Sequence, residues 1–252
     1  KYILCSRNGI EFVDIKTGKW TINHWVRGGC LYGIMPANGL IYAPFHPCAC
    51  FPEAKLNGMT ALAAASKSRA LPKEIPTAGR LEKGPAFAKI TTPDSKSEPW
   101  PTYRHDAARS GASTAKTPYN LKMEWELKLS DSLTPPIAAA DSIFLADKER
   151  HLIYAVNAAS GQKQWTHTAG GRVDSPPTYD RGRLLFGSAD GYVTCLRASD
   201  GALCWRFRGA PGDRLLPAYE QLESAWPVSG SVLVQNDAAH FVAGRSVFLD
   251  KG

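Results

Sequence analysis

Hydrophobic and polar positions alternate along two stretches of the chain that can be laid over one another. The first is LIYAVNAASGQKQW, residues 152–165, and the second is YVTCLRASDGALCW, residues 192–205. In each stretch an alternating segment leads to a glycine turn and then to a second segment that ends in tryptophan, which is the pattern of a β-hairpin. The two copies are offset by forty residues, and a fixed period of that size predicts a repeat architecture.

The turns and the tryptophans are the most specific part of the pattern. A short polar side chain precedes both Gly161 and Gly201, and a glycine there can take the positive φ that a tight strand reversal needs. Trp165 and Trp205 follow these glycines by four residues. A large aromatic at a fixed offset in each hairpin predicts a wedge between neighbouring sheets, with its indole N–H available for a backbone acceptor. We therefore expect these four residues to dock one repeat on the next.

The similarity extends upstream of the hairpins. TPPI at 134–137 precedes SIFLA at 142–146 much as SPPT at 175–178 precedes RLLFG at 183–187, and residues 121–129 add a further polar and apolar alternation. Each unit of about forty residues then holds about four strands. The pattern predicts an all-β fold, a β-propeller built from four-stranded antiparallel blades.

The hairpin sequence resembles a known repeat. Residues 152–165 are similar to the PQQ-type repeat of the quinoprotein alcohol dehydrogenase-like β-propellers, and residues 192–205 are a looser copy. Residues 9–20, GIEFVDIKTGKW, carry the Val-Asp-x-x-Thr-Gly core of that repeat, although Ile22 stands at the docking offset from Gly18. Residues 100–111, from WPTYRHD to Arg-Ser-Gly, resemble the segment that leads into the first repeat of such proteins.

The match along the chain is uneven and suggests four parts. These are degenerate blades at 1–62, a low-order insert on one propeller face at 63–99, the lead-in segment with two well-matched blades at 100–208, and a partial further blade at 209–252. Roughly four to five blade-like units can be counted, whereas such rings commonly need six to eight. We expect the chain to be an incomplete part of a seven- or eight-bladed ring.

Composition and charge narrow the classes of partner. The 252 residues are 44% hydrophobic without a long apolar run, so a sizeable core is expected and a membrane span is not. The formal charge is +7, but Lys and Arg are scattered. The nearest cluster lies in the insert, at Lys67, Arg69, Lys73, Arg80 and Lys83. A solvated loop is favoured there, and no nucleic acid partner is expected.

Cysteine offers the most informative candidate chemistry. Cys195 and Cys204 flank the second glycine turn, and pairing Arg197 with Ala202 would place the two thiols opposite each other. Facing residues on adjacent strands lie close enough for a disulfide, although many such pairs remain packed thiols. Both alternatives stay open, and a disulfide would imply an oxidising compartment.

A second group comprises Cys30, His46, Cys48 and Cys50. Alternate residues of an extended segment share a face, and thiolate with imidazole is a ligand set suited to zinc or copper. Prolines at 44, 47 and 52 argue against a regular strand, and the paired cysteine motifs of structural zinc sites are missing. A Cys30 disulfide with Cys48 or Cys50 ranks first, free thiols second and a metal site third.

The sequence shows no pattern typical of nucleophilic catalysis. The six histidines are spread over different predicted blades, and no Gly-x-Ser-x-Gly elbow is present. The one ionisable cluster, at residues 104–106 (Arg-His-Asp), belongs to the lead-in segment. We interpret it as structural hydrogen bonding in preference to general acid and base chemistry.

The family resemblance implies pyrroloquinoline quinone with calcium, and alcohol or sugar oxidation, as one function. Dehydrogenases of that group share an adjacent Cys-Cys pair, an acidic calcium ligand with an Asn, and a catalytic Asp. Here Ala49 separates Cys48 from Cys50, and no matching acidic set can be placed. Because the repeat itself is a packing device, it does not imply a cofactor, and none is expected.

The preferred hypothesis is therefore a non-catalytic scaffold in the bacterial cell envelope. Relatives with this repeat include lipoproteins that scaffold outer-membrane protein assembly, and the resemblance implies protein partners and a periplasmic or otherwise extracytoplasmic location. No signal peptide is visible. The insert and the residues around Cys48 are the expected partner contacts, because loops fixed on a rigid framework commonly carry binding. The alternatives are a quinone-dependent dehydrogenase and a Cys/His metal or redox module.

Overall fold

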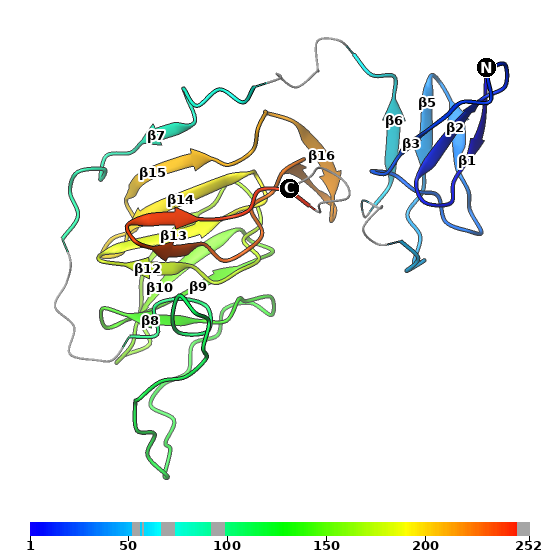
Figure 1. Ribbon diagram of the computed structural model, residues 1–252. Coiled ribbons are helices and arrows are strands. Elements are labelled where there is room, and N and C mark those ends of the chain that lie inside the picture. The colour runs from blue at the N-terminus through cyan, green and yellow to red at the C-terminus, as the bar shows by residue number, and fades with distance from the viewer. Residues whose placement is uncertain (52–55, 57, 67–73, 92–98, 246–252) are drawn as a thin grey trace. The chain divides into compact units, whose positions relative to one another are not determined.

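The computed structural model describes residues 1–51, 56, 58–66, 74–91 and 99–245, and every regular element in this part of the chain is a β-strand (Figure 1). Two compact units are present. Unit 1 comprises residues 1–75, 212–225 and 244–252, and unit 2 comprises residues 76–211 and 226–243. Lys67, Arg69 and Lys73 of the insert, Pro52, and the predicted tail beyond residue 245 lie outside the described residues.

Unit 2 contains two complete blades. The first is an antiparallel sheet in the order β11-β10-β9-β8, made of β8 (Ile137–Ala139), β9 (Ser142–Asp147), β10 (Leu152–Asn157) and β11 (Lys163–Thr168). The second repeats this order with β12 (Thr178–Asp180), β13 (Arg183–Gly187), β14 (Tyr192–Arg197) and β15 (Leu203–Arg208). Figure 1 shows the green strands of the first blade beside the yellow strands of the second. The predicted four-stranded units are confirmed.

Tight turns of one kind join the first two strands of each blade. The turn residues Ala140 and Asp141 have φ of 50° and 57°, and Arg181 and Gly182 have 43° and 81°. Two consecutive residues with positive φ make a two-residue hairpin loop whose twist matches that of the flanking strands. Local backbone geometry therefore sets the reversal between the first two strands of each blade.

The core between the two blades is almost wholly apolar. Phe144 and Ile153 from the first blade meet Leu184, Phe186 and Leu196 from the second, and each is at most 1% exposed. Strands buried on both faces read as continuous apolar runs such as SIFLA and RLLFG. Burying one such side chain contributes about 1.5–3 kcal/mol relative to leaving it exposed, so this interface is a main source of the stability of unit 2.

A partial third blade follows in unit 2. Strands β18 (Leu233–Gln235) and β19 (Ala238–His240) form a hairpin around Asn236 and Asp237, which again both have positive φ. The apolar residues of this segment pack against the core that contains Val193 and Cys195. Strand β12 contacts both β8 and β18, so the first strands of the three blades are neighbours.

The insert contains an ordered strand, which corrects the prediction of a low-order segment. β7 (Leu81–Lys83) pairs antiparallel with β15 and makes the second blade five-stranded. Arg80 anchors this strand, since its guanidinium donates to the carbonyls of Arg208 and Gly209 at 2.8 Å each. The small number of apolar residues in the insert did not predict this strand. A strand added at a sheet edge is held by backbone hydrogen bonds, which every residue except proline can donate.

We expect Glu82→Pro to release β7 from β15. The neighbouring hydrogen bonds, from Arg208 N to Arg80 O and from Gly84 N to Cys204 O, place the Glu82 N–H in the ladder by alternation. Its loss should speed amide exchange at Arg206 and Arg208 at least about tenfold, because a ladder group loses its partner. In the control Glu82→Gln, which removes only the exposed ion pair with Arg206, exchange should stay near wild type. Unchanged exchange in the proline variant would contradict the pairing.

Unit 1 holds two three-stranded antiparallel sheets and a hairpin. The sheets consist of β1 (Tyr2–Cys5), β2 (Ile10–Asp14) and β3 (Trp20–Asn23), and of β4 (Met35–Ala37), β5 (Leu40–Ala43) and β6 (Thr60–Ala63). The hairpin is β16 (Leu215–Ala218) with β17 (Gln221–Ser224). Ile10, Val26 and Ala43 form the centre of a small core. The sequence analysis assigned residues 215–224 to a partial blade with the tail, whereas they group with unit 1.

The β2–β3 hairpin has the same turn as the β10–β11 hairpin of unit 2. Asp14 Oδ1 accepts from the N–H groups of Lys16 and Thr17, and Gly18 N donates to Asp14 O at 2.9 Å. Asn157 makes the equivalent bonds in the β10–β11 hairpin, where Gly161 N donates to its carbonyl at 2.9 Å. The repeat core read at residues 13–18 therefore forms the turn that the resemblance implies.

Candidate functional site

Two tryptophans dock on glycine turns in the same way. The Trp165 ring lies so close to Gly201 that a Cβ there would come within 2.7 Å of it, and its Nε1 donates to Ala198 O at 3.0 Å. Trp125 lies over Gly161 with a corresponding distance of 2.5 Å, and its Nε1 donates to Ala158 O at 3.0 Å. Both glycines have φ near +70°. Glycine is thus needed twice at each turn, for its backbone conformation and for the ring that covers it.

Trp125 is a docking residue that the sequence reasoning missed. It was read only as part of the alternation at 121–129. The signal was present, because Trp125 precedes Trp165 by forty residues, as Trp165 precedes Trp205. Trp125, Leu127 and Leu129 pack in the core on the other face of the first blade. Residues 121–129 thus pack on the first blade as β11 packs on the second blade.

A β-bulge precedes the docking tryptophan in both complete blades. The register shifts between Ala155 and Val156, and again between Cys195 and Leu196, which leaves Gln164 and Cys204 as the extra residues. A bulge bends its strand and re-aims the following side chain. The two bulges are forty residues apart, so they belong to the repeat.

Trp205 borders an open cavity in unit 2. The cavity measures about 350 Å³, and its lining includes Leu185, Val234 and Ala239 together with the charged residues Asp180, Arg181 and Asp237. Arg181 forms ion pairs with both carboxylates. Trp125 and Trp165 are each covered by a glycine turn. In the described part of the chain, Trp205 borders this cavity instead.

The lead-in segment joins the three blades of unit 2 through hydrogen bonds. Trp100 exchanges backbone hydrogen bonds with Ala138 of β8 at 2.7 and 3.0 Å. A donor chain runs from Arg109 to Thr102 at 2.8 Å, then to Thr178 of β12 at 2.8 Å, and on to Val232 O beside β18 at 2.6 Å. The lead-in segment is therefore a structural hub.

The ionisable cluster of this segment also has structural contacts. The His105 ring packs on Trp100 with centroids 5.0 Å apart. Asp106 accepts from Ser110 Oγ and Ser110 N, and these bonds hold the pKa of the Asp106 carboxyl below its usual value. This geometry supports the interpretation of residues 104–106 as a hydrogen-bonded turn.

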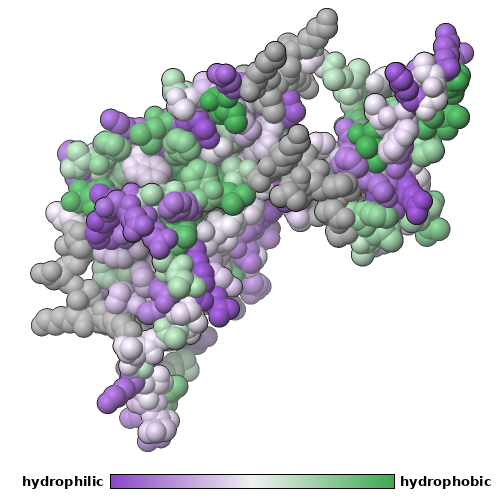
Figure 2. Space-filling view, viewed as in Figure 1, coloured by the Kyte–Doolittle hydropathy of each residue, from purple (hydrophilic) through white to green (hydrophobic). Residues whose placement is uncertain are grey.

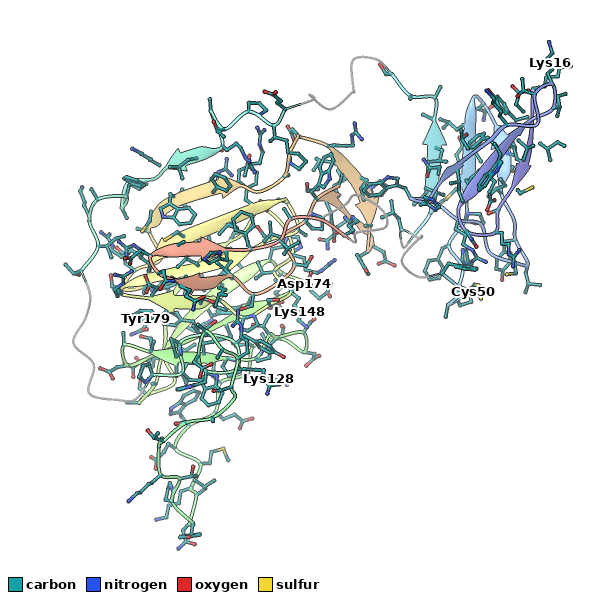
Figure 3. All side chains as sticks on the ribbon, viewed as in Figure 1. Lys16, Cys50, Lys128, Lys148, Asp174 and Tyr179 are labelled. Carbon is teal, nitrogen blue, oxygen red and sulfur yellow. The ribbon has the colours of Figure 1, made fainter. Side chains whose placement is uncertain are left out.

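A thiol cluster forms in the loops of unit 1. The buried Arg27 guanidinium, 4% exposed, donates from Nη1 to Cys48 Sγ at 3.4 Å and from Nη2 to Cys30 Sγ at 3.5 Å. Cys50 completes the cluster through a hydrogen bond with Cys48. Figure 3 shows Cys50 at the opposite end of unit 1 from Lys16, which lies in the β2–β3 turn.

Backbone and side-chain bonds tune these thiols. The Cys50 backbone N–H and, after it, the Arg27 guanidinium lower the pKa of Cys48 to about 6. The Cys50 side chain bonds to the Cys48 sulfur, and this raises the pKa of Cys50. The arrangement favours a Cys48 thiolate held between the Arg27 cation and the Cys50 thiol.

His46 belongs to the scaffold of the cluster. It is 5% exposed, packs on Gly29, and its Nε2 lies 3.3 Å from Arg27 O. The structure brings Cys30, Cys48 and Cys50 together as free thiols, so the disulfide of Cys30 with Cys48 or Cys50 that ranked first is not formed in it. His46 bonds to the backbone that positions Arg27.

The described residues do not favour a metal in this cluster. A guanidinium, itself a cation, contacts the two sulfurs that a metal would need. Nowhere in the described ranges do three or more His, Cys, Asp or Glu side chains form a group that could hold a metal ion. The third-ranked expectation, a metal held by Cys30, His46, Cys48 and Cys50, does not fit this geometry.

That no pyrroloquinoline quinone with calcium is bound stays a prediction from the sequence. The calcium that accompanies the quinone takes several carboxylate and carbonyl oxygens, and the described residues form no acidic group of that kind. The closest pair of cysteines in sequence, Cys48 and Cys50, contacts Arg27 and Cys30 in the loops of unit 1.

Cys195 and Cys204 lie in a register that differs from the expected one. Arg197 N donates to Ala202 O at 2.8 Å as predicted, but the bulge then places Cys195 opposite Trp205. Because two residues of a bulge oppose one residue of the partner strand, Cys204 still lies beside Cys195, and the two side chains form a hydrogen bond with each other. Both are free, buried thiols in the structure, and burial raises the pKa of each.

Comparisons with known proteins match these repeats. The family model described as outer membrane protein assembly factor BamB matches residues 122–247, which is half of the chain. The outer membrane protein assembly factor BamB of Yersinia pestis is 28% identical over 110 residues, or 39% of this chain and 28% of the relative. The chain thus spans less than a third of that relative.

Solved structures of two kinds are similar. BamB from Moraxella catarrhalis has 21% identity and a TM-score of 0.38, covering 48% of this chain and 33% of that one. Quinohemoprotein alcohol dehydrogenase from Comamonas testosteroni has 17% identity and a TM-score of 0.44, covering 57% and 23%. The described part of the chain contains no helix that is long and apolar enough to cross a membrane. On the family match and the blades that lie within it, the chain belongs to the PQQ-like β-propeller family of the outer membrane protein assembly factor BamB.

Proposed function

We propose that this chain is part of a non-catalytic propeller that binds protein partners during outer-membrane protein assembly, outside the cytoplasm. The observation that carries the proposal is the family match over residues 122–247, the region that folds into the two complete blades. The Yersinia pestis relative is named an outer membrane protein assembly factor. Docked blades suit a scaffold because they form a rigid base on which loops can vary.

The loops beside the thiol cluster are the proposed contact surface. Large apolar side chains are exposed there, with Leu31 at 91%, Phe45 at 67% and Tyr32 at 62%. Exposed apolar groups gathered in loops mark interaction sites more often than scattered ones do. Figure 2 shows hydrophobic areas in green among hydrophilic ones in purple on the visible faces of both units. The partner chemistry that fits is an extended segment with apolar side chains, such as a strand of an unfolded β-barrel protein.

We expect the chain to bind a urea-unfolded outer-membrane β-barrel protein with a Kd of about 1–10 µM, as weak transient contacts do, measured by surface plasmon resonance. Leu31→Asp should weaken this binding at least about fivefold, because an apolar anchor is lost. The matched control is Ile15→Asp, since Ile15 is 54% exposed in the β2–β3 turn, and this variant should bind like wild type.

Two results would count against the scaffold. The first is equal binding of an unfolded water-soluble protein, which would show that the contact is not selective. The second is dye reduction with alcohols or aldoses after reconstitution with pyrroloquinoline quinone and calcium, which would establish the dehydrogenase alternative.

A further inference from the structure

The thiol cluster carries chemistry that partner binding does not require. Cys48 is half-buried, while Cys30 and Cys50 are exposed. The sulfurs of Cys48 and Cys30 lie on the two terminal nitrogens of a single guanidinium, which places them next to each other. Three thiols from two separate loops thus converge on one buried cation.

We propose that Cys48 and Cys30 form a reversible thiol–disulfide switch that exchanges with low-molecular-weight disulfides, with Cys48 as the attacking thiolate and Cys30 as the resolving thiol. Arg27 is the positioning residue. The proposal is independent of the scaffold function, because it concerns the covalent chemistry of one loop cluster.

Each residue of the cluster has a separate role. The nucleophile in disulfide exchange is the thiolate, and Cys48 is the thiol that receives the Cys50 backbone N–H and the Arg27 guanidinium. With a pKa of about 6, roughly nine-tenths of Cys48 is ionised at pH 7, against a few per cent of an ordinary cysteine. The raised pKa of Cys50 disfavours Cys50 as the attacking group.

The surroundings of Cys48 allow a small disulfide to reach it. A cavity of about 260 Å³ is lined by Cys30 and Cys48 together with Gly29, Leu31, Tyr32, His46 and Pro47. The charged or titratable groups that face Cys48 in the described loops include Arg27, Cys30 and Cys50, and His46 stands behind Arg27. The cluster therefore combines a nucleophile, a second thiol and an entry path.

The exchange balances in two steps. The Cys48 thiolate attacks one sulfur of an external disulfide RSSR, so that an S–S bond to Cys48 forms and one RS⁻ leaves. Cys30 then gives up its proton to water or to the departing thiolate, and its sulfur attacks Cys48 and expels the second RS⁻. Two protein thiols are oxidised, and one RSSR is reduced to two thiols.

Oxidation would also change the adjacent surface. The disulfide removes the thiolate charge from Arg27 and ties the turn at residues 29–33 to the loop that carries Cys48. Leu31 and Tyr32, which line the same cavity, stand next to this link. The switch can therefore alter the apolar loops beside it.

The first test uses the unmodified chain. Alkylation of Cys48 by iodoacetamide, followed by peptide mass spectrometry between pH 4.5 and 9.5, should rise with a midpoint near pH 6. At pH 6 the rate should be about ten times that of free cysteine, because the larger thiolate fraction outweighs the lower intrinsic nucleophilicity of a low-pKa thiol. A Cys48 midpoint near 8.5 would overturn the proposal.

The second test identifies the partner thiol with glutathione disulfide. Cys30→Ser should trap a glutathione adduct on Cys48, Cys50→Ser should still form the Cys30–Cys48 disulfide, and Cys48→Ser should lose both products. A first adduct on Cys30, or a Cys48–Cys50 bond as the main product, would overturn the assignment. Arg27→Gln should move the alkylation midpoint upward while Cys48 stays alkylatable, and an unmoved midpoint in the folded variant would remove Arg27 from the proposal.

Discussion

Trp165→Ala should lower the free energy of unfolding of unit 2 by about 3 kcal/mol, the low end of the range for core tryptophan truncations, because the ring is partly buried against the core. The indole fills the space against Gly201 and donates to Ala198 O at 3.0 Å. It also packs 6.0 Å from the Phe144 ring, centroid to centroid, in the core between the two complete blades. Truncation would leave a cavity at the interface and an unpaired carbonyl.

Urea unfolding followed by far-ultraviolet circular dichroism would measure this loss. Amide exchange at Leu184 and Leu196, which are fully buried in unit 2, would assign the transition to that unit. Trp165→Phe should cost less, because it keeps an aromatic ring and loses mainly the hydrogen bond. Trp205→Ala is the comparison from the same repeat position, and it should also cost less since the Trp205 ring borders an open cavity.

An equal loss at Trp165 and Trp205 would show that generic aromatic burial dominates over docking on the glycine turn. A Trp165→Ala loss below about 1 kcal/mol, the level of an average substitution, would contradict the wedge role itself.

The blades could be predicted because local and long-range signals agree over residues 121–208. The periodic apolar strands, the Gly161 and Gly201 turns and the Trp165 offset all specify the same hairpins, and such agreement marks a well-determined fold. The docking of Trp165 also explains the forty-residue period. The tryptophan on the last strand of one blade must reach the glycine turn of the next blade. The family resemblance then followed from the same residues.

Three features could not be predicted from these signals. Strand β7 (Leu81–Lys83) pairs through its backbone across more than a hundred residues of sequence, and its side chains carry little periodicity. The bulge at Cys204 shifted the register so that Cys195 pairs with Trp205, because one extra residue changes a register without changing the alternation before it.

The role of Arg27 was the third feature. A single arginine in the sequence has no pattern, and its contacts with Cys30 and Cys48 exist only because two loops meet. The cysteine spacing predicted the convergence of the thiols, yet the choice between metal binding and thiol chemistry depended on which cation lay between them. Only the folded loops show that it is a guanidinium.

Gly201→Ala should destabilise unit 2 by about 3 kcal/mol, for two separable reasons. Gly201 has φ +73°, and an alanine there adopts a left-handed conformation that costs about 1 kcal/mol. The new Cβ would also lie 2.7 Å from the Trp165 ring, and relieving such overpacking costs about 1–3 kcal/mol.

Gly79→Ala separates the two contributions. Gly79 lies in the same unit and has the same φ of +73°, but nothing lies within 4 Å of its Cβ position. Its substitution should cost only the backbone strain of about 1 kcal/mol, read from the same urea transition. Equal costs at the two glycines would mean that the Trp165 ring adjusts freely, and the close packing would then carry no stability.

The double variant Trp165→Ala with Gly201→Ala tests whether the two residues act as one device. Once the ring is removed, the alanine Cβ has nothing to displace, so the second substitution should cost only its backbone strain. The double variant should then be less destabilised than the two single losses together by about 2 kcal/mol, a coupling expected of residues in direct contact. Strict additivity would show that ring and turn stabilise the blades independently, and the forty-residue spacing of tryptophan and glycine would need another physical cause.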